Sequence, residues 1–171
     1  CRSCKTKKMA CYDELLGEDG TDCGDGRMEG VRRLEAMTPD ERFRFWQGEL
    51  SRCIRCNACR NVCPACSCEK CVFDNPASGV ENKAAANSFE ENLFHIIRAF
   101  HVAGRCTDCG ECSRVCPQHI PLHLLNRKLI ADMNELYGPY QAGADLESRP
   151  PLMDFRFDDP EPSTARRGGA Q

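Results

Sequence analysis

Apolar side chains recur at helical spacing in four segments of the chain. Residues three and four positions apart share one face of an α-helix, so the spacing predicts amphipathic helices over residues 29–37, 38–52, 88–103 and 121–137. The apolar positions in these segments are Val31 and Leu34; Phe43, Trp46 and Leu50; Leu93, Ile97 and Phe100; and Leu122, Leu125, Leu129, Met133 and Leu136. The chain is therefore predicted to be mainly α-helical.

Residues at the ends of these segments support the helical interpretation. Thr38 and Glu41 have capping-box spacing with a proline at the first helical position, which predicts a helix start. Gly104 and Gly138 follow two of the apolar segments and predict helix ends. We interpret Phe43 and Trp46 as core residues or as a cover for the cysteines that follow. A partner-docking face is the alternative.

Two runs of cysteine with identical spacing follow the second and third predicted helices. Each reads C-x2-C-x2-C-x3-C-P, the spacing of two-cluster [4Fe–4S] proteins, in which the fourth cysteine binds the other cluster. The expected ligands are Cys53, Cys56, Cys59 and Cys116 for one cluster, and Cys106, Cys109, Cys112 and Cys63 for the other. Zinc sites usually combine two separated C-x2-C pairs, and disulfides need an oxidising compartment. Zinc sites and disulfides therefore both explain the two identical cysteine runs less well than iron–sulfur clusters do.

Seven further cysteines lie outside the two runs. They are Cys1, Cys4, Cys11, Cys23, Cys66, Cys68 and Cys71. One hypothesis is a third [4Fe–4S] cluster, held by the Cys66, Cys68 and Cys71 trio and completed by Cys1 and Cys4. The rival is a zinc site formed by Cys1, Cys4, Cys11 and Cys23. A trio alone cannot supply four ligands.

Composition and charge narrow the function further. The hydrophobic fraction of 41% includes fifteen cysteines, so the clusters are expected to form part of the core and the apoprotein to fold poorly. The formal charge is −3 before any cluster adds its own negative charge, which argues against a nucleic-acid partner. We expect no transmembrane segment and a reducing, cytoplasmic location. Phosphate-loop, dinucleotide and nucleophile–base motifs are absent, so no catalytic residue is assigned.

Charged and imidazole side chains near the runs allow two interpretations. The histidines, which are His95, His101, His119 and His123, are interpreted as core or surface residues rather than ligands. His119, next to the second run, could tune a cluster by hydrogen bonding. The arginines near the runs are Arg52, Arg55, Arg60, Arg105 and Arg114. They form either a solvated face or a set of cations that offsets cluster charge.

The chain divides into three predicted parts. Residues 1–37 are a cysteine-bearing segment in which residues 1–28 are mostly loop and a third metal site is possible. Residues 38–143 form the helical two-cluster domain. Residues 144–171 are rich in proline and mixed in charge, which predicts an extended or disordered tail.

The stretches from Phe45 to Cys71 and from Ile97 to Leu122 resemble a known class of protein. They are similar to dicluster iron–sulfur subunits associated with heterodisulfide reductases and related flavin-based electron-bifurcating or hydrogenase complexes of anaerobes. The resemblance covers residues 38–137 and implies the α-helical ferredoxin fold, which succinate dehydrogenase iron–sulfur subunits share. It also extends to the Cys1–Cys4 pair and the cysteine trio.

The resemblance implies an electron-transfer subunit that makes no bonds itself. Such a subunit passes single electrons between a flavin-bearing partner and a catalytic subunit of an oxidoreductase complex. The alternatives are a free ferredoxin-like shuttle and a structural zinc protein. The proline-rich tail and the aromatic face of residues 38–52 favour a permanent subunit, because a free shuttle would need neither docking surface.

Overall fold

The protein is a small assembly of helices joined by loops, as predicted. The computed structural model describes residues 11–18, 20, 24–75, 88–142 and 147–151, and in these parts every regular element is helical. Cys1, Cys4, Cys23 and most of the predicted tail lie outside the described residues. No helix in the described ranges is both long enough and apolar enough to span a bilayer.

The elements follow one another along the chain as four main helices and four short ones. They are η1 (Gly24–Met28), α1 (Glu29–Glu35), α2 (Pro39–Ser51), α3 (Ala58–Asn61), η2 (Val72–Asp74), α4 (Ser88–His101), α5 (Glu111–Arg114) and α6 (Leu122–Tyr137). The main helices α1, α2, α4 and α6 are those that the apolar spacing predicts. The one-turn helices α3 and α5 lie inside the two cysteine runs, and η1 replaces part of the predicted N-terminal loop.

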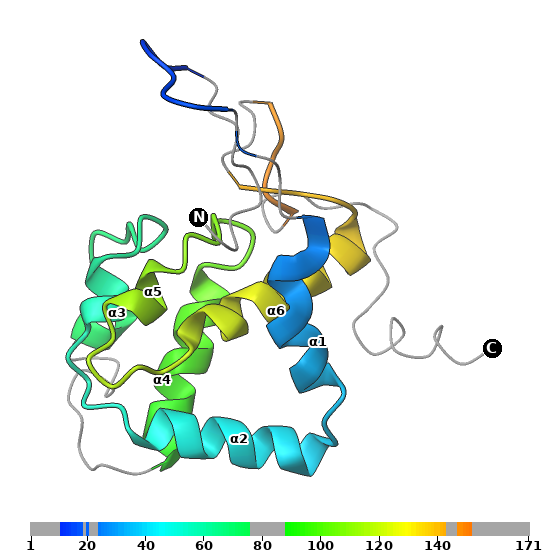
Figure 1. Cartoon of the computed structure of the whole chain (residues 1–171). Helices are drawn as coiled ribbons and strands as arrows, with labels where there is room; N and C mark the ends of the chain where they lie inside the picture. The colour runs from blue at the N-terminus through cyan, green and yellow to red at the C-terminus, as the bar shows by residue number, and fades with distance from the viewer. Residues whose placement is uncertain (1–10, 19, 21–23, 76–87, 143–146, 152–171) are drawn as a thin grey trace, which may run out of the picture.

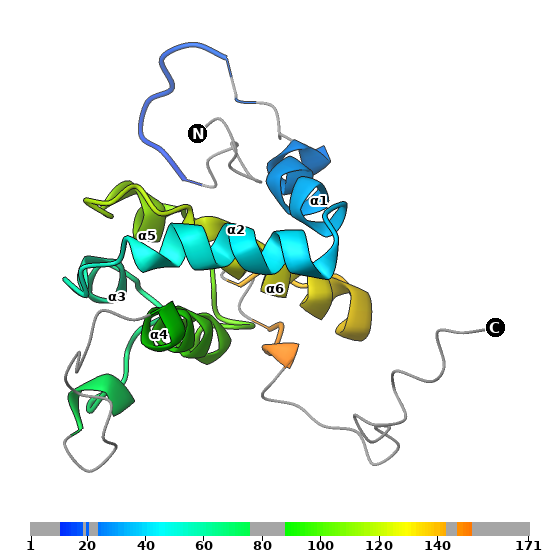
Figure 2. The same ribbon diagram turned by 90° about the horizontal axis from the view of Figure 1, so that it is seen from below.

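The main helices form a frame that holds the two cysteine runs together. Helix α2 packs across α4, α4 also contacts α6, and α6 contacts α1 and α5. The short helices α3 and α5 contact each other at one side of the molecule, while α1 lies at the other side (Figures 1 and 2). The chain therefore brings its two cysteine runs side by side, although a long connector separates them in sequence.

Helix α2 begins at the predicted capping box. The Thr38 side chain accepts a hydrogen bond from the Glu41 backbone N–H at 3.3 Å, and the Thr38 N–H donates to the Glu41 carboxylate at 2.8 Å. These contacts satisfy two backbone donors at the helix start. They also set the point from which α2 runs toward the first cysteine run.

Replacing Thr38 with alanine is expected to lower the free energy of unfolding by about 1 kcal/mol, because one helix donor loses its acceptor. Urea unfolding of the metal-loaded protein, followed by circular dichroism without oxygen, measures the change. Thr38→Ser keeps the hydroxyl and is the control. An equal loss in both variants would contradict the capping role.

The core combines apolar residues with cysteines. Leu50, Phe94, Ile120 and Leu122 pack in one buried cluster, which also contains the cysteines Cys59, Cys112 and Cys116. Because these thiols lie within the hydrophobic core, a metal cluster bound to them would form part of the core. The metal-binding chemistry and the packing of the helices are thus coupled.

Only the C-terminal part of α2 reaches this core. Leu50 is buried and Trp46 packs against the cluster, but the Phe43 side chain is 61% exposed. Helix α2 crosses α4 near its C-terminal end, so its first turns extend beyond the contact (Figure 2). The interpretation of Phe43 as a core residue is therefore wrong.

Helix α4 buries a face that only partly coincides with the one its apolar spacing predicts, because Ile97 packs against the core but Phe100 does not. Phe94, Arg98 and Val102 point into the protein, whereas Phe100 is 59% exposed. Two polar residues, His95 and Arg98, lie on the buried side. Hydrophobicity alone could not identify this face because its polar residues face the cysteines.

Helix α1 packs closely against α6 through a glycine. A Cβ atom on Gly30 would lie 2.6 Å from Leu124 Cδ2, which is too close for a side chain without movement. The small residue therefore allows the two helices to approach. This contact anchors the described part of the N-terminal region to the rest of the fold.

Candidate metal centres

The two cysteine runs fold into loops with the same backbone shape. In the first run Arg55 and Asn57 have φ values of 55° and 60°, and in the second Asp108 and Gly110 have φ values of 58° and 75°. These residues occupy equivalent places in the repeat, and each pair leads into a single helical turn, α3 or α5. The left-handed residues turn the backbone tightly. The local fold is thus duplicated along with the cysteine spacing.

Backbone donors point at the first cysteine of each loop. The Arg55 N–H donates to Cys53 Sγ, and the Asp108 N–H donates to Cys106 Sγ, both with N···S distances of 3.4 Å. A hydrogen bond of this kind favours the thiolate over the thiol. At Cys106 this hydrogen bond opposes the effect of burial on the thiol pKa but does not outweigh it.

The first loop surrounds a small cavity of about 20 Å³. Its lining includes the cysteines Cys53, Cys56 and Cys59 of the first run together with Cys116 of the second. Phe94, His95 and Leu122 close the cavity from α4 and α6. The structure thus brings together the four cysteines that the sequence assigns to one cluster.

The second loop surrounds a matching cavity, also of about 20 Å³. Its lining includes Cys106, Cys109 and Cys112 of the second run together with Cys63 of the first. His123 and Asn126 of α6 complete one side. Each cavity is therefore bordered by three cysteines from one run and the fourth cysteine of the other. The ligand assignment itself stays a prediction.

The donor set fits an iron–sulfur cube. Four thiols surround each cavity, and a [4Fe–4S] cluster takes one thiolate on each of its four irons. A single zinc ion would instead draw its ligands to one centre, with Zn–S bonds of about 2.3 Å. Among the described residues, no group of three or more His, Cys, Asp or Glu side chains is arranged to hold a single metal ion.

Burial makes the cysteines poor thiolates without metal. It raises the pKa of Cys59 and of Cys112, and it raises the pKa of Cys106 to about 11. Cys63 differs, because a hydrogen bond from the Cys66 thiol lowers the Cys63 pKa to about 6 and raises that of Cys66. Metal ions would replace the thiol protons at the buried positions.

Polar residues behind the second cavity form a network that sequence reasoning missed. Asp108 makes buried ion pairs with Arg27 at 2.8 Å and with Arg127 at 2.7 Å. Asn126 Nδ2 lies 3.6 Å from Cys112 Sγ. The ion pairs of Asp108 join the second loop to η1 and to α6, although these three segments are far apart in sequence. The clue available beforehand was a charged residue, Arg127, within the apolar stretch of α6.

The histidines differ in part from expectation. His95 is 1% exposed and lines the first cavity, and neither ring nitrogen has a hydrogen-bond partner in the part of the chain described. Burial, aided by the charges of Arg98 and Arg55, lowers its pKa to about 3. His119 is exposed and lines neither cavity, and His123 shares a 2.8 Å hydrogen bond with Ser113. His95 therefore borders the first cavity and His123 the second, whereas His119 borders neither.

The arginines that the sequence places near the runs divide into two groups. Four of them bond surface neighbours: Arg52 to Glu49, Arg60 to Asp74, Arg105 to the His101 carbonyl and Arg114 to Glu111. Arg55 instead lies with its guanidinium carbon 4.2 Å from the centroid of the Phe94 ring and lines the first cavity. Arg98, which sequence reasoning missed, is buried even more deeply than Arg27 and Arg127.

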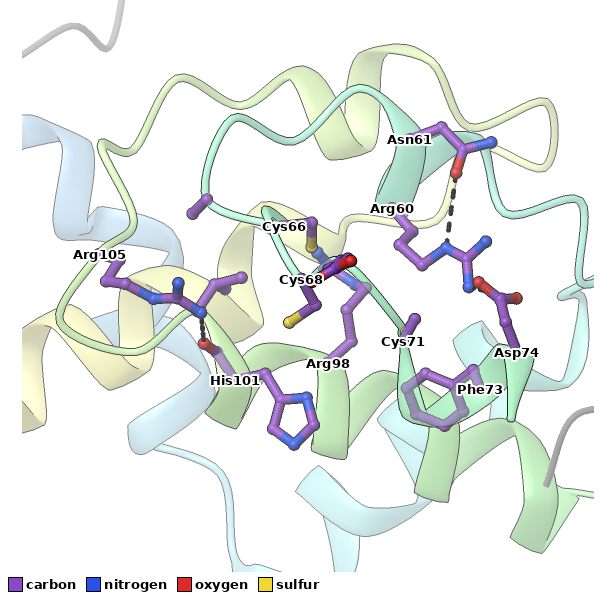
Figure 3. A pocket seen from close by; sticks show the side chains of 13 residues that line it. Arg60, Asn61, Cys66, Cys68, Cys71, Phe73, Asp74, Arg98, His101 and Arg105 are labelled. Carbon is purple, nitrogen blue, oxygen red and sulfur yellow. Dashed lines mark hydrogen bonds and ion pairs between the residues drawn. The ribbon is translucent and has the colours of Figure 1, made fainter. Parts of the chain in front are cut away.

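The cysteine trio lines a third and larger cavity of about 420 Å³. Cys66, Cys68 and Cys71 face it together with Arg98 and Arg105 (Figure 3). The other proposed ligands are not brought to it in the described residues. Cys11 is exposed and lines none of the three cavities, while Cys1, Cys4 and Cys23 lie outside the description.

Comparison with known proteins identifies the cofactor type. Residues 49–120, which include both runs, match the family model described as a 4Fe–4S dicluster domain. The F420-dependent formate dehydrogenase subunit beta of Methanocaldococcus jannaschii is 32% identical over 110 residues, covering 64% of this chain and 28% of the relative. The F420-dependent formate dehydrogenase 1 subunit beta of Methanococcus maripaludis is 33% identical over 107 residues, covering 63% and 26%.

A third relative belongs to a different oxidoreductase. The succinate dehydrogenase iron–sulfur subunit of Bacillus subtilis is 33% identical over 99 residues, covering 55% of this chain and 39% of the relative. The chain thus spans between about a quarter and two fifths of the length of these relatives. Its residues 49–120 resemble a 4Fe–4S dicluster domain, and its cofactors are [4Fe–4S] clusters.

Proposed function

We propose that this chain, whose residues 49–120 match a 4Fe–4S dicluster domain, is an electron-transfer subunit of an oxidoreductase complex. It passes single electrons between a flavin-bearing partner and a catalytic subunit, and it makes no substrate bonds itself. The complex is of the heterodisulfide reductase-associated or related anaerobic type, and it works in a reducing cytoplasm. The named relatives, which are subunits of dehydrogenases, support a permanent subunit over a free shuttle.

The exchange of the fourth cysteines carries this proposal. Cys63 lies at the second cavity and Cys116 at the first, so each cluster would be held partly by the other loop. The loops share a helix contact, α3 against α5. The thiols of Cys59 and Cys112 are near enough for their charges to interact. Two clusters held this closely would exchange electrons readily.

Exposure of the cysteines supports a path through the domain. Cys56 in the first cavity and Cys109 in the second are exposed, whereas Cys59 and Cys112 are buried. Each cluster would therefore have one corner at the surface and one in the interior. Electrons could arrive at one surface corner and leave from the other, which is what a subunit between two partners requires.

Anaerobic purification followed by iron, sulfide and zinc analysis tests the cofactors. We expect acid-labile sulfide and, after dithionite reduction, an EPR spectrum of two interacting [4Fe–4S] clusters, because the loops adjoin each other. The removal of iron by a chelator is expected to reduce the helical circular dichroism, since three cysteines belong to the core. Stoichiometric zinc without sulfide would contradict the proposal and favour a structural zinc protein.

Native mass spectrometry of the protein from its own cells tests the subunit role. Co-purification with a flavoprotein and a catalytic subunit is the expected result. A monodisperse monomer that exchanges electrons freely with many donors would contradict it and favour a shuttle.

A further inference from the structure

The third cavity contains thiols that the two-cluster function does not use. It lies between residues 60–74 and the C-terminal end of α4, and its volume is about 420 Å³. Cys66 and Cys71 are half-buried there, and Cys68 is exposed. The three thiols come from one short stretch of chain and share one cavity (Figure 3). This arrangement has the composition of a metal site.

A buried cation points into the same cavity. Arg98 is 2% exposed, and none of its three guanidinium nitrogens has a hydrogen-bond partner among the residues the structure describes. It lines the third cavity and neither of the two smaller ones. Figure 3 shows it rising from α4 toward Cys66 and Cys68. A buried charge without a partner is strongly unfavourable, so this guanidinium requires negative charge nearby. The thiols of Cys66, Cys63 and Cys59 lie close enough to interact with it electrostatically, and Cys66 is the one of these that lines the same cavity.

We propose that Cys66, Cys68 and Cys71 hold a third iron–sulfur cluster in this cavity, with Arg98 as the positioning residue that offsets its negative charge. Three thiolates and the bridging sulfides would give Arg98 the acceptors that it lacks. Binding of an assembled cluster would replace the three thiol protons, which pass to solvent. The fourth iron would remain open to a ligand from outside the trio.

The position of the cavity suits a cluster in series with the other two. The Cys66 thiol hydrogen-bonds Cys63, and the Cys66 N–H donates to the Cys63 carbonyl at 3.0 Å. Since Cys63 is the proposed fourth ligand of the second cluster, a centre on Cys66 would lie directly beside that cluster. Cys68 is exposed and would place the outer side of the new centre near the surface. The electron-transfer path would then contain a third redox centre.

Replacing Cys66 and Cys68 together with alanine tests the site in the full protein, purified without oxygen. The expected result is the loss of about four irons per copy, with the EPR signals of the two dicluster centres retained. Cys11→Ala is the control, since Cys11 is exposed and lines none of the three cavities. An unchanged iron content, or the loss of zinc instead of iron, would overturn the proposal.

The outcomes separate this inference from the proposed function. If the native protein has no iron or sulfide, the two-cluster function itself fails. If it keeps about eight irons and the trio variant loses none, only the third cluster fails.

Arg98→Gln tests the positioning role. Loss of the positive charge is expected to make the reduction potential of the third cluster more negative, and Arg98→Lys should restore it in part. A shift confined to the other two clusters, or no shift at all, would overturn the role of Arg98. If Arg98→Gln does not fold, the iron content of the trio variant still decides whether the site exists.

Discussion

Replacing Cys63 with alanine is expected to remove the cluster of the second loop and to spare the cluster of its own loop. Cys63 lies at the cavity of Cys106 and Cys109, not at that of its sequence neighbours. Loss of one of four thiolates leaves one iron without a protein ligand. We expect about half of the dicluster iron to be lost, and the interaction between the two reduced clusters to disappear from the EPR spectrum.

Two single variants make this result specific. The EPR signal that remains in Cys63→Ala should match that of Cys109→Ala, which damages the second cavity. It should differ from that of Cys56→Ala, which damages the first. A match to Cys56→Ala would mean that each run holds its own cluster, and the proposed exchange of ligands would be wrong.

Replacing Asp108 with asparagine is expected to lower the free energy of unfolding by about 3–5 kcal/mol, because two buried guanidiniums lose their counter-ion. The Arg27 and Arg127 side chains are nearly inaccessible to water. Asparagine keeps the size of the side chain and tolerates the φ of 58° at this position, so the variant removes the charge without straining the loop. The shift of the urea midpoint under anaerobic conditions measures the loss.

Glu29→Gln provides the matched control for Asp108→Asn. It breaks a 3.3 Å ion pair with Arg32 in which both side chains are largely exposed. Such surface pairs contribute at most about 1 kcal/mol. If the two variants lost the same stability, the Asp108 network would be no more than a surface pair in its effect.

The helices and the cysteine runs could be predicted from sequence because each depends on the spacing of residues that are close together along the chain. The apolar repeats identify α1, α2, α4 and α6, and the capping box at Thr38 locates the start of α2. The cysteine spacing also predicts which thiols meet at each cavity, since the exchange of fourth ligands is a property of the motif. The helices and the loop shapes depend on residues within a few positions of one another, and the pairing of the two runs follows from the duplicated motif.

The polar surroundings of the cavities could not be predicted because they depend on contacts between distant segments. Asp108 pairs with Arg27, which lies in a stretch expected to be loop. Arg98 and His95 belong to an amphipathic helix, where charged or polar residues ordinarily face water. The exposed Phe43 and Phe100 are the converse case: their apolar character suggests burial that the helix crossing does not provide.

The proposed crossing of the fourth cysteines would also set the order in which the protein can mature. Neither loop could complete a cluster by itself, so under the proposed ligand sets the first cluster must wait for Cys116 to be synthesised. Cluster insertion would therefore follow the synthesis of both loops, and it would join two segments that are remote in sequence. A truncated product lacking the second loop would carry a complete set of ligands for neither cluster.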